Sequence, residues 1–70
     1  MRSYESNGKE YRYMTAIYNG REYGFRPCDT KGITEEELQK AVDERGHMQY
    51  EPRAVWLVVP GIGYGWEVEK

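Results

Sequence analysis

The chain has 70 residues, of which 31% are charged and 39% hydrophobic, and its formal net charge is −2. This composition is typical of one small soluble domain and excludes a disordered chain. No apolar run approaches the ~20 residues of a membrane span, and the first ten residues lack the apolar stretch of a signal peptide. The single cysteine, Cys28, excludes an internal disulfide framework. We therefore expect one globular domain over residues 1–70, cytoplasmic and without a membrane partner.

The charge is unevenly distributed. Residues 1–28 carry five basic and three acidic side chains, whereas residues 29–70 carry five basic and nine acidic ones. A nucleic-acid-binding domain that relies on electrostatic attraction normally has a larger basic excess. The charge distribution therefore favours other partners.

Four tyrosines surround Asn19-Gly20 within residues 10–27. An Asn-Gly pair between alternating segments predicts a hairpin with a type I′ turn, which sets Tyr18 opposite Arg21. In that register the core face holds Met14, Ala16, Tyr18, Tyr23 and Phe25, with Arg12 at its edge. The outer face holds Tyr11, Tyr13, Thr15, Ile17, Glu22, Gly24 and Arg26, with Arg26 directly across from Tyr13.

A second turn signal, Asn7-Gly8, lies upstream. It sets Tyr4 opposite Tyr11, which extends the outward tyrosines, but it also sets Glu5 opposite Glu10, a like-charge pair. Residues 1–9 are thus either an extra strand or a flexible arm.

A helix is predicted over residues 34–45. Thr34 is the expected N-cap and Glu37 completes a capping box, with Ile33 and Leu38 in the positions of a hydrophobic staple. Glutamates fill the first turn, where the helix dipole favours negative charge. Gly46 is the expected stop, and the buried stripe is Leu38, Ala41 and Val42.

Residues 54–70 predict a second hairpin. A four-residue loop over residues 60–63 pairs Val59 with Tyr64, Leu57 with Trp66 and Val55 with Val68, which makes one face wholly apolar. Trp56 and Val58 then lie on the other face together with Gly65, Glu67 and Glu69. Residues 47–53 are expected to be irregular or briefly extended, because Pro52 argues against a central strand.

These elements predict an α+β fold in the order ββαββ, with one helix packed on an antiparallel sheet of four or five strands. The alternative is a small curled β-barrel with one helix, because the many glycines permit sharp strand bending.

The sequence has few side chains that could act in catalysis or bind a metal. Cys28 and His47 are the only thiol and imidazole, and nothing in the sequence fixes them as a nucleophile and its base. One histidine and one cysteine do not supply a structural zinc site. Glu67 and Glu69 are explained by a charged edge strand, and the glycines of residues 61–65 precede a strand instead of the helix that a phosphate site needs. We expect no enzyme, metal or cofactor.

An aromatic surface is the feature that points to function, because tyrosine and arginine are enriched in protein interfaces. The sequence predicts a non-enzymatic protein-binding module that acts by occupying a larger partner, like small phage- or plasmid-encoded inhibitors and regulators of a host macromolecular machine. The alternative is a single-stranded nucleic-acid-binding domain that stacks bases on its tyrosines. The expected partner-binding residues are Tyr11, Tyr13, Ile17, Arg26 and Trp56.

Overall fold

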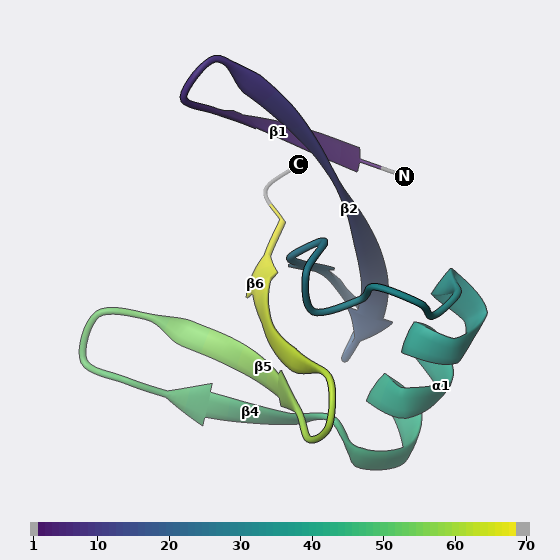
Figure 1. Cartoon of the computed structure of the whole chain (residues 1–70). Helices are drawn as coiled ribbons and strands as arrows, with labels where there is room; N and C mark the ends of the chain where they lie inside the picture. The colour runs from purple at the N-terminus through teal and green to yellow at the C-terminus, as the bar shows by residue number, and fades with distance from the viewer. Residues whose placement is uncertain (1, 69–70) are drawn as a thin grey trace.

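Four hairpins, which share strands, and one helix build residues 2–68 (Figure 1). The computed structural model describes residues 2–68. All strand pairs are antiparallel and join in the order β1-β2-β3-β6-β5-β4. The elements are β1 (Arg2–Ser6), β2 (Lys9–Tyr18), β3 (Arg21–Phe25), α1 (Glu35–Arg45), β4 (His47–Tyr50), β5 (Val55–Val59) and β6 (Gly63–Glu67).

The α+β class and the helix on an antiparallel sheet are confirmed, but the sheet has six strands instead of four or five. The additional strand is β4, which pairs only with β5 and ends before Pro52. A turn between Glu51 and Ala54 closes this hairpin, so the proline disturbs no ladder. The barrel alternative is wrong, because β1 and β4 stand at opposite ends of the strand order and do not pair within residues 2–68.

Both Asn-Gly turns form as the sequence predicts. Asn7 and Asn19 have φ of 52°, and Gly8 and Gly20 have φ of 76° and 75°. Positive φ at both central residues is the signature of a type I′ turn. The registers follow, with Tyr4 opposite Tyr11 in the first hairpin and Tyr18 opposite Arg21 in the second. Residues 2–6 are therefore a strand, and the expected pairing of Arg26 with Tyr13 is wrong because β3 ends at Phe25.

The core lies between α1 and one face of the sheet. The helix contributes its predicted stripe, and Phe25 is the central aromatic residue at 0% exposure. The helix packs mainly on β2, with fewer contacts to β5. The buried cluster consists of Ala16, Tyr23, Phe25, Leu38, Ala41, Val42, Leu57 and Val59, with Met14, Tyr18, Ile33, Met48 and Ile62 packed against it.

The helix ends are set by different means. At the start, Thr34 Oγ1 accepts from the Glu37 amide at 3.1 Å and Glu37 Oε1 accepts from the Thr34 amide at 3.0 Å, which confirms the capping box. At the end, Gly46 is the C-cap but has an extended backbone with φ of −68° instead of the left-handed one. Glycine suits this position sterically, because a Cβ there would lie 2.7 Å from the Val42 carbonyl oxygen.

The predicted register of the β5–β6 hairpin is wrong by one residue. Val58 pairs with Tyr64 and Leu57 with Gly65, so the loop has three residues, 60–62, instead of four. The Ile62 amide donates to the Val59 carbonyl at 2.9 Å, and Gly61 has φ of 86°, which fits a type II turn around Pro60-Gly61.

A one-residue slip moves every side chain to the other face. Phe25 explains why the observed register wins: a Cβ at position 65 would lie 2.7 Å from its ring, so glycine must face the core there. Tyr64 and Trp66 consequently leave the core face and join Trp56 on the outer face. Glu69, expected beside Glu67, lies outside the described residues.

Among residues 2–68, no helix is long and apolar enough to cross a membrane.

Candidate functional site: an aromatic groove

The sheet face opposite α1 carries a groove of about 650 Å³. Its walls come from strands far apart in the sheet order, because Tyr4 lies on β1, Trp56 on β5 and two rings on β6. The strands of an antiparallel sheet twist progressively, and this twist can bring such distant strands around one hollow. We call this hollow the aromatic groove; its lining residues are Tyr4, Arg26, Glu51, Trp56, Tyr64 and Trp66.

The four groove rings form two perpendicular pairs. Tyr4 meets Trp66 at a ring-centroid distance of 6.2 Å and an interplanar angle of 90°, and Trp56 meets Tyr64 at 6.3 Å and 82°. Edge-to-face contacts of this kind are favoured by the ring quadrupole. Tyr11 stacks on Tyr4 at 5.5 Å and continues the first pair outward. Within the groove lining, Tyr4 and Tyr64 remain exposed, whereas Trp56 and Trp66 are half-buried.

Gly24 permits Tyr13 and Trp66 to pack against each other. It lies on β3 opposite Trp66, and a Cβ there would lie 2.7 Å from the Tyr13 ring and 2.9 Å from the Trp66 ring. The missing side chain thus leaves room for rings from β2 and β6 to lie over β3 and meet at 5.1 Å.

Tyr13 lies on the outer face as predicted but is only 7% exposed, so the expectation of an exposed ring is wrong. Trp66 and Tyr4 contact it, at 5.1 and 5.8 Å between ring centroids. Tyr13 therefore packs beside the groove rings and does not line the groove. Its burial comes from other outer-face rings and not from an inversion of the two faces.

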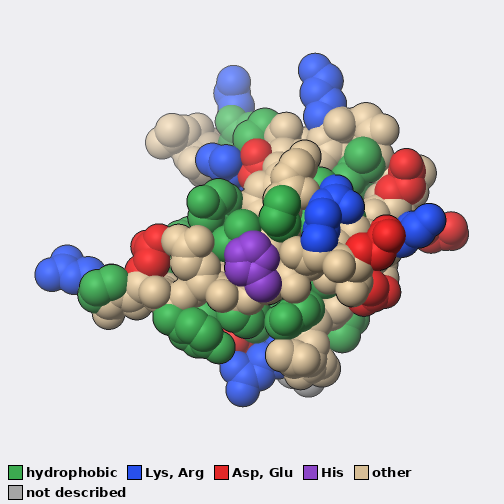
Figure 2. Space-filling view, turned by 90° about the horizontal axis from the view of Figure 1, so that it is seen from below, with side chains coloured by type: hydrophobic (Ala, Val, Ile, Leu, Met, Phe, Trp, Pro, Cys, Tyr) green, Lys and Arg blue, Asp and Glu red, His purple; other side chains and the backbone are tan. Residues whose placement is uncertain are grey.

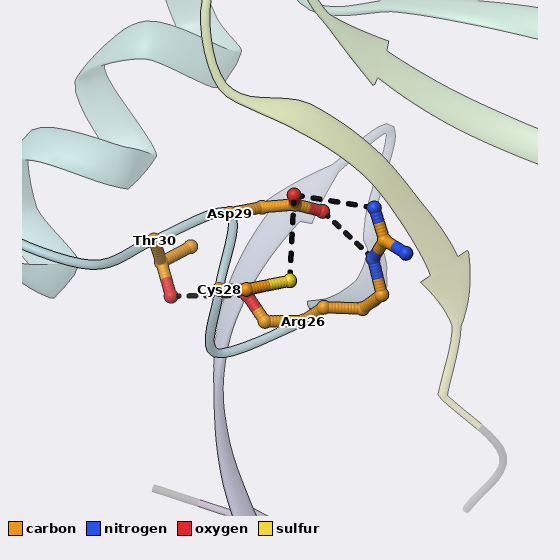
Figure 3. A network of polar contacts seen from close by, with 4 residues as sticks. All are labelled: Arg26, Cys28, Asp29 and Thr30. Atoms are coloured by element: carbon orange, nitrogen blue, oxygen red, sulfur yellow. Dashed lines mark hydrogen bonds and ion pairs between the residues drawn. The ribbon is translucent and has the colours of Figure 1, made fainter.

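Arg26 lies beside the groove just after β3 and is fixed by its own loop (Figure 3). Its Nε donates to Asp29 Oδ2 at 3.0 Å and a terminal nitrogen donates to Asp29 Oδ1 at 3.2 Å. The Arg26 carbonyl accepts from the amides of Asp29 and Thr30, which closes the loop. The hydrogen bonds and the charge of Asp29 raise the pKa of Arg26 above its ordinary value. Arg26 and Asp29 together contribute no net charge to the groove.

Glu51 supplies the other charge of the groove lining. Its Oε1 accepts from Gln49 Nε2 at 3.0 Å, and among residues 2–68 no basic side chain forms an ion pair with it. The groove lining contains one basic and one acidic side chain, and when Asp29, the partner of Arg26, is included the three charges sum to −1.

The structure brings together two of the five residues expected to bind a partner, Arg26 and Trp56. Tyr11 is next to the groove through its stack on Tyr4, and Tyr13 packs behind the lining. Ile17 is 51% exposed but lies near the far end of β2, outside the groove.

Sequence reasoning missed Tyr64 and Trp66 as groove residues, because it paired them with the core-facing residues of β5. It also missed Glu51, which it placed in an irregular segment. The glycines at positions 63 and 65 could have revealed this. Two glycines on one face of a strand mean that its large apolar side chains lie on the other face.

The possible catalytic side chains are dispersed. Cys28 Sγ contacts Asp29 Oδ1 at 3.8 Å, whereas His47 is exposed and its Nδ1 lies 3.5 Å from the Arg45 carbonyl oxygen. Figure 2 shows the histidine at the molecular surface. Glu67 forms an ion pair with Arg21 at 3.3 Å. Within residues 2–68 no three His, Cys, Asp or Glu side chains are grouped as metal ligands.

Comparisons with protein-family models, with curated proteins and with solved structures gave no match to this chain.

Proposed function

We propose that this chain is a non-enzymatic protein-binding module that holds a segment of a larger protein in the aromatic groove. The observation that carries the proposal is the composition of the groove: four surface-facing Tyr and Trp rings and one compensated arginine. These residue types dominate the energy of protein interfaces because each combines a large apolar area with a polar tip. The groove volume also lies in the range of sites that enclose a ligand.

Occupation of a partner surface requires no chemistry from the module itself. This agrees with the separation of Cys28, His47 and Glu67 over three different parts of the fold. A module of this kind acts as an inhibitor or regulator when the segment that it holds is needed by the partner.

Binding of single-stranded nucleic acid is the second candidate, because bases also stack on tyrosine and tryptophan. The charge of the groove disfavours it: Arg26 is engaged by Asp29, and Glu51 would repel a phosphate backbone.

Quantitative capture from a lysate of the source organism tests the proposal. The bait is the wild-type chain, and the variants are Trp56→Ala, Tyr64→Ala and the control Tyr50→Ala. Tyr50 is 76% exposed and, paired with Val55, lies on the opposite sheet face, so its truncation removes a similar ring from outside the groove.

We expect a protein that wild type and Tyr50→Ala retain after nuclease treatment and that both groove variants lose. The purified partner should then bind the groove variants about tenfold or more weakly, as for truncated interface anchors. Equal retention by all four chains, or material that disappears on nuclease treatment, would contradict the proposal.

A further inference from the structure

The groove offers hydrogen-bond donors that the chain itself does not use. None of the side-chain hydrogen bonds among residues 2–68 involves the hydroxyl of Tyr4 or Tyr64, or the indole N–H of Trp56 or Trp66. Tyr4 and Tyr64 are exposed residues, and the half-buried Trp56 and Trp66 have no buried unpartnered nitrogen within residues 2–68, so their indole N–H groups are accessible to solvent. An indole N–H only donates, and a phenol donates readily. The groove therefore suits a ligand rich in carbonyl acceptors.

The rings also select for shape. In each perpendicular pair, Tyr4 with Trp66 and Trp56 with Tyr64, the planes of the two rings stand at about a right angle to each other. A compact apolar ring of the ligand can pack against the face of one aromatic ring and the edge of the other. Proline supplies such a ring, and in the polyproline II helix its carbonyls have no internal hydrogen bonds and point outward.

Charge adds a third requirement. Glu51 is the one uncompensated charge of the groove lining, because Asp29 holds Arg26. A basic side chain in the ligand can meet this carboxylate, whereas a phosphate or an acidic segment would be repelled. Donors, perpendicular rings and charge thus point to the same kind of ligand.

We propose that the segment held in the aromatic groove is proline-rich, adopts the polyproline II conformation and carries a basic residue that contacts Glu51. This inference rests on the proposed function and names its ligand class. Pre-formed polyproline II helices lose little entropy on docking, which is why aromatic-lined grooves are an effective way to bind them.

The test uses defined peptides and the intact chain. The probe is a ten-residue peptide of nine prolines with one central arginine; the comparison peptides replace alternate prolines by alanine or replace the arginine by proline. A ten-nucleotide oligothymidine and free trimethyl-lysine serve as ligands of other classes. Binding is followed by tryptophan fluorescence and by the two indole N–H resonances in NMR spectra, and circular dichroism verifies that each variant is folded.

We expect the proline–arginine probe to bind about tenfold or more tightly than the alanine-substituted peptide. Tyr64→Ala and Trp56→Ala should each lose about tenfold in affinity or more, and Tyr50→Ala should lose nothing. Glu51→Gln should weaken binding of the proline–arginine probe by a larger factor than binding of the all-proline peptide, and the difference between the two factors reports the charge contact.

Equal affinity for the alanine-substituted peptide, tighter binding of oligothymidine or trimethyl-lysine, or no binding of the probe at millimolar concentration would overturn the ligand assignment. The proposed function fails separately. If the peptides do not bind but partner retention still depends on Trp56 and Tyr64, only the ligand class is wrong. If retention is also independent of both residues, the groove is not the binding site.

Discussion

At the scale of single residues, two glycines control where the aromatic rings go. Gly65 lies under the Phe25 ring on the core face, and Gly24 lies under the rings of Tyr13 and Trp66 on the outer face. Neither has a positive φ, so their role is steric. The missing Cβ at each position leaves room for the edge or tip of a ring to approach the strand backbone.

Gly24→Ala tests this role directly. The added methyl group would lie within 3 Å of two rings, and we expect it to lower the free energy of unfolding by about 1–3 kcal/mol, as overpacking usually does. Chemical denaturation followed by tryptophan fluorescence measures the loss, with the exposed strand change Ser3→Ala as the control. An unchanged unfolding midpoint in Gly24→Ala would show that the rings do not lie over this strand.

Tyr23 gives the domain a predictable response to alkaline pH. Burial, followed by the nearby charge of Glu67, raises the pKa of its phenol above the ordinary value of 10.0. A group whose pKa is higher in the folded state stabilises the fold fully below its unfolded pKa, and this contribution is lost as pH rises through the folded pKa. Stability should therefore fall above about pH 10.

Tyr23→Phe removes the ionisable group while keeping the ring. We expect the variant to lose less stability than wild type between pH 9 and pH 11, about one pH unit to either side of the ordinary tyrosine pKa. Denaturant midpoints across this range provide the measurement, with Tyr11→Phe as the exposed control. Identical pH profiles for wild type and Tyr23→Phe would mean that Tyr23 ionises equally well in both states.

At the scale of elements, α1 does more than cover the core. Beyond Tyr13, β1 no longer pairs with β2, and Gln39 of α1 takes over part of that edge. Its Oε1 accepts from the Ile17 amide at 2.8 Å and its Nε2 donates to the Ile17 carbonyl at 2.9 Å. The side-chain amide thus pairs with β2 as a neighbouring strand would, and Asp43 orients it at 3.0 Å. An exposed strand edge invites pairing with other chains, and this contact closes part of it.

Gln39→Ala should free the Ile17 amide. We expect faster hydrogen exchange of that amide and a loss of about 1 kcal/mol in stability, because water replaces part of the two hydrogen bonds. Gln39→Glu keeps the acceptor but loses the donor and should give an intermediate exchange rate. Lys40→Ala, on the exposed side of the same helix, is the control; unaltered exchange of Ile17 in Gln39→Ala would show that the contact does not form in solution.

Local signals in the sequence predicted some elements well. The type I′ turn at Asn19-Gly20 and the capping box of Thr34 and Glu37 each depend only on residues that are neighbours in the sequence. Neither structure needs a contact from the rest of the fold. Residues 60–66 could not be read in this way. The sequence suggested a four-residue loop, but the structure has a three-residue one. The shorter loop is favoured by Phe25, which is distant in sequence and whose ring requires glycine at position 65.

The candidate site was only partly predictable for the same reason. The outer faces of the β2–β3 hairpin and of β5 were assigned correctly, and they led to Arg26 and Trp56. The groove, however, also needs Tyr64 and Trp66, whose face depends on the register of the β5–β6 hairpin. The exposure of Tyr13 was not readable either, because Tyr4 and Trp66 cover it from other strands.

In the whole molecule, the two faces of the sheet differ in what covers them. One face is closed by α1, and the other has no helix over it within residues 2–68. The β1–β2 and β4–β5 hairpins project on either side of β6 (Figure 1). Residues from both hairpins and from β6 line the aromatic groove, and none of them belongs to the buried core cluster, so the proposed binding would use other side chains than those that stabilise the fold.

NMR spectra of the ¹⁵N-labelled chain, recorded with and without the partner protein or peptide that it binds, test this account most directly. The account predicts that binding shifts both indole N–H resonances and the amides of Tyr4, Glu51 and Tyr64, while the side-chain amide of Gln39 and the amide of Val42 on the helix side stay in place. Shifts concentrated on α1 or on Tyr50, with the two indole resonances unmoved, would contradict it.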